Sequence, residues 1–404
     1  MEHFVTTNKF VYRGQPYPGI PLFFDDQYYP IKVLNNYMLY LVFEQGSAES
    51  PLTWRSYADA LLDYFCWLNA NGLKWDDKPR MTKHGKEISN LALYQRWSAH
   101  DHRKPDGYNL ANSTINNRVA RIQFFYKWAK EYARLINFLP YVEVMKQKPY
   151  RHPDAFAHTH GKQYALSSNL KLPEKKQLPP VLSLEQCREL LACSISKTLK
   201  LMMKMMLGTG LRNEECRTFP RKYVFDPSGL DKSKRICISL DPRSMKLKGN
   251  KARDIYLSWQ RMAALYEYTK YGEGVKRAHR YHDQFGVAPP LLFLQEQGQP
   301  WSENGLTNGF RKLWHGHERR GYKYPPVLSF KVTPHMLRHT YATMELYSER
   351  QKRGVGHALA WVRDRLGHSS IQTTTIYVHC LDLMEDQELN EWNQQLDRMM
   401  DDDK

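Results

Sequence analysis

Residues 333–339 read Thr-Pro-His-Met-Leu-Arg-His, a stretch with the features of a helix start. A threonine before a proline is typical of an N-cap followed by the first helical position. His335 and Arg338 are three residues apart, so a helix places both on one face of its first turns. The amino-terminal end of a helix also favours a bound anion. The segment therefore predicts a helix that begins at Pro334 and presents an imidazole and a guanidinium to an anion.

Three further segments carry side chains suited to the same chemistry. They are Gly-Thr-Gly-Leu-Arg-Asn-Glu-Glu at 208–215, Lys-Gly-Asn-Lys at 248–251, and Leu-Gly-His at 366–368 followed by Tyr377. Strand-like runs at 236–240 and 254–257 predict that the second segment lies between two strands, with a turn at Gly249-Asn250.

Any single pair among these residues is a weak signal, because the chain contains 16 His and 26 Tyr. A His followed nine positions later by Tyr is expected about once by chance. His315 and Tyr324 indeed repeat the spacing of His368 and Tyr377. The joint order and local context of the four segments make an accidental assembly improbable.

In order and in flanking residues, the four segments resemble the tyrosine recombinase (phage integrase) family. The resemblance covers roughly residues 179–385, and the helical stretch 114–129 is similar to the family's core-binding domain. It implies a mainly α-helical protein with a small β-sheet (α+β), in which a helical N-terminal domain precedes a mixed α/β catalytic domain. The expected division is an N-terminal arm at 1–30, a helical core DNA-binding domain at 31–140, a basic linker at 141–178, and a catalytic domain with a C-terminal tail helix at 179–404.

The residue types themselves fit phosphodiester chemistry. The transition state concentrates negative charge on the non-bridging oxygens, so catalysis needs preorganised cations. Arg212 and Arg338 supply planar guanidinium forks that match phosphate oxygens bidentately. Tyr377 is the candidate nucleophile, and because a phenol has a pKa near ~10, it needs nearby cations or a base. His335, with His368 assisting, could serve as that base.

The resemblance also implies the outcome of the reaction and the role of one lysine. The tyrosine attacks the scissile phosphate to give a 3′-phosphotyrosine and a free 5′-hydroxyl, with no ATP, metal or other cofactor. Lys248 matches the position of the lysine that protonates the leaving oxygen, although Lys246 and Lys251 are close in sequence. Glu215 could brace Arg212 from one helical turn away, or form an exposed pair of no consequence.

The charge balance favours a polyanionic partner. Lys and Arg total 59 against 42 Asp and Glu, which gives a net charge of +17 and a pI near 9.4. The predicted helix at 114–129 carries Arg118, Arg121 and Lys127, which we expect, together with Lys251, to contact DNA phosphates. A solvated helix surface has the same appearance, and a merely basic protein has the same composition.

Length and composition limit the remaining possibilities. A chain of 404 residues exceeds the usual size of one hydrophobic core, which predicts two domains. The six cysteines form no CxxC pair, so neither a zinc site nor a disulfide framework is expected. The sequence has no apolar run of membrane-spanning length, and its first ten residues lack the pattern of a signal peptide. We expect a cytoplasmic, nucleoid-associated protein.

These observations favour a site-specific recombinase that acts on double-stranded DNA, and the resemblance implies a homotetramer on two recombination sites. The tail after Tyr377 could dock on a neighbouring subunit or pack on its own domain. A type IB topoisomerase, which nicks and reseals without exchanging strands, is the first alternative. A DNA-binding relative without catalytic activity is the second.

Overall fold

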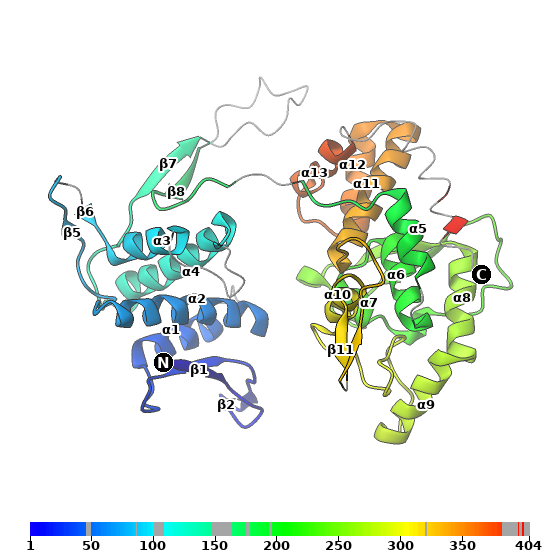
Figure 1. Cartoon of the computed structure of the whole chain (residues 1–404), viewed down its shortest axis with the longest axis horizontal. Coiled ribbons are helices and arrows are strands. Elements are labelled where there is room, and N and C mark those ends of the chain that lie inside the picture. Colours follow the sequence, from blue (N-terminus) through cyan, green and yellow to red (C-terminus); the bar gives the residue numbers. More distant parts are fainter. Residues whose placement is uncertain are drawn as a thin grey trace. The chain divides into compact units, whose positions relative to one another are not determined.

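The computed structural model describes residues 1–45, 50–85, 87–100, 109–147, 164–174, 178–193, 196–319, 321–381, 395 and 398–399. The chain forms two compact units, Met1–Lys176 and Gln177–Lys404 (Figure 1). Helices predominate in both units, and the described strands pair into small two-stranded sheets, which confirms the predicted fold class.

The first unit is built on four helices and several short hairpins. Its described elements are β1 (Glu2–Val5), β2 (Val11–Tyr12), β3 (Gln15–Pro16), β4 (Pro21–Phe24), α1 (Lys32–Phe43), α2 (Pro51–Ala70), β5 (Arg80–Met81), β6 (Glu87–Ile88), α3 (Asn90–His100), α4 (Asn112–Glu131), β7 (Glu143–Gln147) and β8 (Tyr164–Ser168). Ser50 caps α2 by accepting a hydrogen bond from the Thr53 amide, and Pro51 occupies the first helical position. α2 and α4 pack on each other through their apolar faces.

An aromatic core fills this unit. Tyr64 on α2 and Tyr126 on α4 are buried, and their hydroxyl groups are 2.8 Å apart. Tyr126 also donates to the backbone carbonyl of Trp75 at 2.6 Å. Each buried hydroxyl therefore has a hydrogen-bond partner, as buried polar groups require.

Residues 1–30 differ from the irregular arm expected from the sequence. β1 and β4 pair antiparallel, with Glu2 opposite Phe24 and Val5 opposite Pro21. Ile20 and Phe23 are fully buried in the same core as the helices. The segment is therefore an integral part of the first unit, because its apolar side chains are buried there.

The expected linker at 141–178 also contains regular structure. β7 and β8 pair antiparallel from Glu143 opposite Ser168 to Gln147 opposite Tyr164. The segment between these strands lies outside the described residues. The boundary between the two units follows residue 176, so this hairpin belongs to the first unit.

The second unit contains nine described helices of five or more residues around one hydrophobic core. Its described elements are α5 (Leu184–Ala192), α6 (Lys197–Thr209), α7 (Asn213–Arg217), η2 (Arg221–Tyr223), β9 (Ile236–Leu240), η3 (Lys248–Asn250), β10 (Arg253–Leu257), α8 (Trp259–Lys270), α9 (Glu273–Phe285), α10 (Gly305–His315), β11 (His317–Arg319), β12 (Tyr322–Tyr324), α11 (Pro334–Arg353), α12 (Val355–Leu366), η4 (Ile371–Thr373) and α13 (Ile376–Leu381). Ser183 and Gln186 form a capping box at the start of α5.

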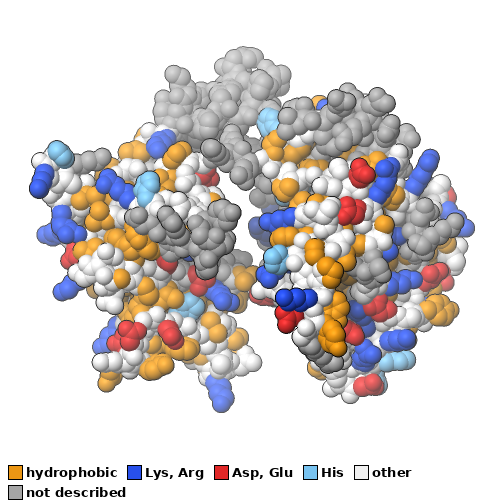
Figure 2. Space-filling model, in the orientation of Figure 1, with side chains coloured by type: hydrophobic (Ala, Val, Ile, Leu, Met, Phe, Trp, Pro, Cys, Tyr) orange, Lys and Arg blue, Asp and Glu red, His pale blue; other side chains and the backbone are white. Residues whose placement is uncertain are grey.

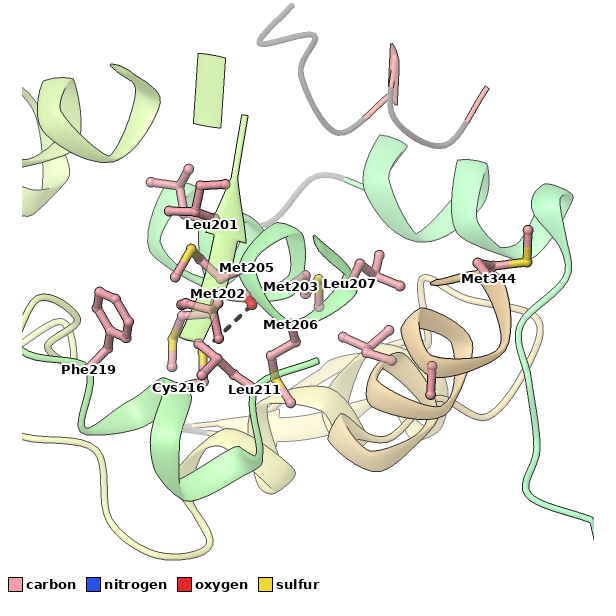
Figure 3. Packing of buried hydrophobic residues seen from close by; sticks show 14 of the residues in the cluster. Leu201, Met202, Met203, Met205, Met206, Leu207, Leu211, Cys216, Phe219 and Met344 are labelled. Atoms are coloured by element: carbon pink, nitrogen blue, oxygen red, sulfur yellow. Dashed lines mark hydrogen bonds between the residues drawn. The ribbon is translucent and has the colours of Figure 1, made fainter. Parts of the chain in front are cut away.

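Helix α6 forms the centre of this core. Its methionines, including Met202 and Met206, are buried among residues of neighbouring elements such as Leu211, Phe219 and Met344 (Figure 3). Cys216 on α7 donates from its thiol to the Met202 carbonyl at 3.7 Å. All the leucines and methionines of this helix are buried, which suits it to a central position. α6 thereby fixes α7 on one side and α11, which packs against it, on the other.

Membrane-spanning helices, metal-binding groups and disulfides each bear on the function class of a chain. Within the described residues, no helix is both long and apolar enough to cross a membrane. In the same part of the chain, no group of three or more His, Cys, Asp or Glu side chains is placed to hold a metal ion. The six cysteines are free thiols.

Candidate active site

The turn after α6 places Arg212 beside α11 and α12. Gly210 ends the helix with a left-handed backbone, at φ +65°. A Cβ atom at this position would lie 2.4 Å from the Tyr341 ring and 2.9 Å from the Leu366 side chain. Only glycine fits both the dihedral angle and the space. The chain can then pass close to α11 and place Arg212 as the N-cap of α7.

Glu215 holds Arg212 from one turn into α7. It accepts hydrogen bonds from the Arg212 amide at 2.8 Å and from Arg212 Nη1 at 2.9 Å. The same carboxylate binds Arg253 on β10, whose Nη1 lies 2.9 Å from Oε1 and whose Nη2 contacts Oε2. Burial by itself would raise the pKa of Glu215, but the hydrogen bonds and charges of Arg253 and Arg212 outweigh it and lower that pKa to about 2. Glu215 is therefore a buried anion between two guanidinium groups.

Arg338 reaches the same place from the first turns of α11. The helix begins at Pro334 with Thr333 as N-cap, as predicted. Arg338 is only 4% exposed, and its guanidinium donates to the backbone carbonyls of Gly210 and, at 2.7 Å, Leu366. Burial and the charges of Arg212 and Arg253 lower its pKa, but the value of about 9 leaves it protonated at neutral pH.

Tyr377 lies on α13 against the same helix. It is 2% exposed, and its hydroxyl is 3.0 Å from Nδ1 of His339. The His368 ring stacks on the Tyr377 ring, with centroids 6.4 Å apart and planes at 15°. Nδ1 of His368 is 3.0 Å from the Thr374 hydroxyl. Two histidines from different elements thus enclose the phenol.

The electrostatics of these groups reflect burial near cations. Burial, with smaller effects of His335 and Arg338, lowers the pKa of His339 to about 4. Burial, with the charges of Arg338 and Arg212, lowers the pKa of His368 to about 3. Burial raises the pKa of Tyr377, whereas Arg338 and Arg212 act to lower it. Near neutral pH the free site therefore holds neutral imidazoles and a protonated phenol within an array of positive charge.

Lys248 lies at the tip of the connection between β9 and β10. These strands pair as predicted, and Gly249 there has φ +72°. The Lys248 side chain is exposed, and its charge, with those of Arg338 and Arg212, helps to lower the pKa of His335 after the larger effect of burial. Lys248 is therefore close enough to act electrostatically on this site.

A basic cavity of about 680 Å³ adjoins the cluster. It is bounded by the end of β9, the start of β10 and the turn after α12. Its lining residues are Ser239, Lys251, Ala252, Arg253, Asp254, Arg363, Asp364, Arg365, Gly367, His368 and Ser369. An anion in this cavity would lie beside His368 and face several guanidinium groups.

Comparison with known proteins identifies the family. Residues 180–383, about half of the chain, match the sequence model of the phage integrase family. The chain belongs to the phage integrase family. It is therefore classed as a tyrosine-type site-specific recombinase.

Curated relatives and solved structures agree with this assignment. This phage integrase is 25% identical over 404 residues to transposase A from transposon Tn554 of Staphylococcus aureus, covering 95% of this chain and 96% of the relative. It is 23% identical to tyrosine recombinase XerC of Bacillus pumilus, over 86% of this chain and 92% of the relative. Its fold is similar to that of XerH site-specific recombinase bound to a palindromic difH substrate, with a TM-score of 0.50, 18% identity, and coverage of 88% of this chain and 83% of the XerH chain.

The structure thus brings all the predicted catalytic residues of this phage integrase into one region of the second unit. The charges of Arg212 and Arg338 act on the Tyr377 phenol and, with that of Lys248, on His335. Arg212 Nη2 also donates to the Gly367 carbonyl at 3.3 Å, immediately before His368. The carboxylate contact expected of Glu215 is present, and Glu215 is buried rather than exposed.

The residues predicted to contact DNA have varied surroundings. Lys and Arg side chains lie on the visible face of both units (Figure 2). Arg118 pairs with Asp63 at 2.7 Å, and Lys127 pairs with Glu143 at 2.8 Å. The Arg121 guanidinium lies 5.7 Å from the centroid of the Tyr57 ring. Lys251 is exposed and lines the basic cavity.

Sequence reasoning missed two residues of this integrase site. His339 follows Arg338 directly, and its position beside a helical HxxR pattern was the available signal. Arg253 opens β10, two residues after Lys251, and only the fold reveals its pairing with Glu215. Most of the tail after Tyr377, including Leu383, Met384, Leu389, Trp392 and Leu396, lies outside the described residues.

Proposed function

We propose that this phage integrase cleaves and rejoins duplex DNA through a 3′-phosphotyrosine formed at Tyr377. The observation that supports this most strongly is the convergence of three side chains, the partly buried Arg212 at the N-cap of α7, the buried Arg338 on α11 and the buried Tyr377 on α13. A phenol beside two preorganised guanidinium groups is suited to attack on a phosphodiester.

In the proposed step, the Tyr377 oxygen bonds to the scissile phosphorus as the bond from phosphorus to the 5′-oxygen breaks. Arg212 and Arg338 bind the non-bridging oxygens with N–H groups left over from their contacts with Glu215 and the backbone carbonyls. Those contacts hold both guanidinium groups in place before the substrate arrives, which limits the reorganisation needed in the transition state.

Lys248 donates the proton that the leaving 5′-oxygen needs. Its place at the tip of the β9–β10 connection, exposed and with a glycine beside it, allows the ammonium to reach a bound strand. The phosphotyrosine ester retains the energy of the broken bond, so a 5′-hydroxyl can reverse the step. Neither ATP nor a metal is required for this chemistry.

We further propose that the partner is double-stranded DNA, and that four copies act on two recombination sites in the nucleoid. The net charge of +17 and the basic cavity beside His368 favour a polyanion. Arg121 and Lys251 are suited to phosphate contact. Arg118 and Lys127 would exchange their carboxylate partners for phosphates.

The test of this function is a nicked duplex that loses its 5′-hydroxyl fragment after cleavage and so traps the covalent product. The wild-type protein is expected to form an adduct that persists in denaturant, and Tyr377→Phe is expected to form none. Tyr324→Phe is the matched control, because Tyr324 has the same spacing from a histidine but is exposed on β12. An adduct that survives in Tyr377→Phe and disappears in Tyr324→Phe would assign the nucleophile elsewhere.

A second assay separates recombination from the two alternatives. Exchange of strands between two copies of the recognised site, with little relaxation of unrelated supercoiled plasmids, is expected of a recombinase. Efficient relaxation without exchange indicates topoisomerase activity. Binding without any adduct indicates a catalytically silent relative.

A further inference from the structure

The Tyr377 hydroxyl contacts a histidine that is not the one in the HxxR pattern. Nδ1 of His339 lies 3.0 Å from that oxygen. His335, one helical turn earlier on α11, has its ring centroid 6.3 Å from that of His339, and its side chain is exposed. Among the described residues, His339 is the side chain that the structure places in hydrogen-bonding contact with the nucleophile.

We propose that His339 is the general base that accepts the Tyr377 proton, which leaves His335 to interact with the substrate phosphate. This inference rests on the proposed function. As the Tyr377 oxygen bonds to phosphorus, its O–H bond breaks and the proton moves to Nδ1 of His339. The bond to the 5′-oxygen breaks at the same time, and that oxygen takes a proton from Lys248.

The geometry favours His339 over the other two histidines. The His368 ring lies nearly parallel to the Tyr377 ring with centroids 6.4 Å apart, and its Nδ1 hydrogen-bonds with the Thr374 hydroxyl rather than with the phenol. His335 is the most exposed of the three and feels the charge of Lys248, which suits a group near the open phosphate position. His339 alone combines a short contact with partial burial.

The surroundings also keep His339 in its basic form. Burial lowers its pKa to about 4, and His335 and Arg338 on the same helix contribute. From the adjoining elements, His368 and the Tyr377 phenol face it. It is therefore neutral near pH 7 and able to accept a proton. A bound phosphate would add negative charge nearby and make the imidazolium easier to form.

The experiment compares full-length wild type with His339→Asn, His339→Gln and His282→Asn in single-turnover adduct formation on the nicked duplex. Asparagine places an amide near the position of Nδ1 and keeps a hydrogen bond to Tyr377, but it accepts no proton. Glutamine is the second variant should asparagine disturb the fold. His282 lies exposed on α9 and is the matched control. Melting temperature and affinity for the intact site are measured for all four proteins.

A second substrate carries sulfur in place of the 5′-bridging oxygen. A thiolate leaves without a proton donor, so this substrate bypasses Lys248 but still requires activation of Tyr377. The His339 variants are expected to form the adduct at least about 100-fold more slowly than wild type on both substrates. Lys248→Ala is expected to be slow on the oxygen substrate and close to wild type on the sulfur substrate.

The pH profile gives a readout that a purely structural role of His339 would not change. The wild-type rate is expected to rise with pH and level off once the base is deprotonated. With His339→Asn it is expected to continue rising about tenfold per pH unit toward the pKa of the phenol. The proposal would be overturned if folded His339→Asn formed the adduct at a rate within threefold of wild type. It would also be overturned if the sulfur substrate restored the rate of this variant to that of wild type. Failure of wild type to form any adduct would instead refute the proposed function.

Discussion

Replacing Glu215 with glutamine tests the electrostatic centre of the site. The Glu215 carboxylate is 1% exposed and accepts hydrogen bonds from Arg212 and Arg253 on two different elements. Glu215→Gln keeps the shape of the side chain and removes its charge. Two guanidinium groups then lose their shared counter-ion, and the glutamine NH2 group points a donor at one of them.

Two routes give similar magnitudes for the loss of stability. The pKa of Glu215 falls from 4.5 to about 2 on folding, and each pKa unit corresponds to 1.36 kcal/mol, so the charged form contributes about 3 kcal/mol. Breaking a buried ion pair by removing one partner typically costs about 3–5 kcal/mol. At about 2–4 °C per kcal/mol for a unit of this size, the melting temperature is expected to fall by about 6–12 °C.

The pH dependence has a definite sign. Because the folded pKa of Glu215 is depressed, its contribution is complete above the unfolded value of 4.5 and is lost as pH falls through about 2. The difference in unfolding free energy between wild type and Glu215→Gln is therefore largest at pH 7 and narrows steadily below about pH 5. Urea unfolding of both proteins at a series of pH values measures this free-energy difference.

The neighbouring residue provides the control. Glu214 lies on the same helix, is partly exposed, and forms ion pairs with Arg217 at 3.3 Å and Lys246 at 3.8 Å. Exposed pairs contribute about 0–1 kcal/mol, so Glu214→Gln is expected to change little. Equal unfolding free energies for Glu215→Gln and wild type at pH 7, or a difference that stays constant down to pH 3, would refute the reasoning.

Two further substitutions probe how the fold positions the guanidinium groups. In Arg338→Lys, a single nitrogen replaces the two that donate to the Gly210 and Leu366 carbonyls. We expect urea unfolding to show a free energy of unfolding lower by about 1–3 kcal/mol, and single-turnover assays to show adduct formation at least about 100-fold slower. Gly210→Ala is expected to lower the melting temperature by at least about 5 °C, because its Cβ would clash with the Tyr341 ring. Gly286 also has a positive φ, at +70°, but open space around it, so Gly286→Ala is expected to lower the melting temperature by less.

The elements that the sequence predicted well have local signals. The helix start at Pro334 and the strands around Lys248 each depend on residues within a few positions of one another. Such patterns fix backbone conformation without reference to the rest of the chain. Their order along the sequence then carried the family resemblance.

The parts that escaped prediction depend on distant partners. β1 is short and mostly exposed, and it becomes a strand because β4 pairs with it some twenty residues later. The position of His339 beside the HxxR pattern does not specify its partner, since its contact with Tyr377 exists only once α13 packs on α11. Arg253 likewise acquires its role through Glu215, which comes from another element. A pattern of residue types cannot specify such contacts.

The charge arrangement of the site connects its stability to its chemistry. In the described part of the site, the Glu215 carboxylate lies among the guanidinium groups of Arg212, Arg253 and Arg338. After the larger effect of burial, the repulsion from Arg212 and Arg253 lowers the pKa of Arg338. This excess of positive charge is unfavourable in the free protein, and the α6 and α11 packing must hold it together. A phosphate relieves the repulsion on binding, and the charge that grows on its oxygens during attack relieves it further. The repulsion between the guanidinium groups therefore lowers the stability of the free protein and favours the transition state. Glu215 sets the strength of this repulsion, because its carboxylate neutralises one positive charge and leaves the others for the phosphate.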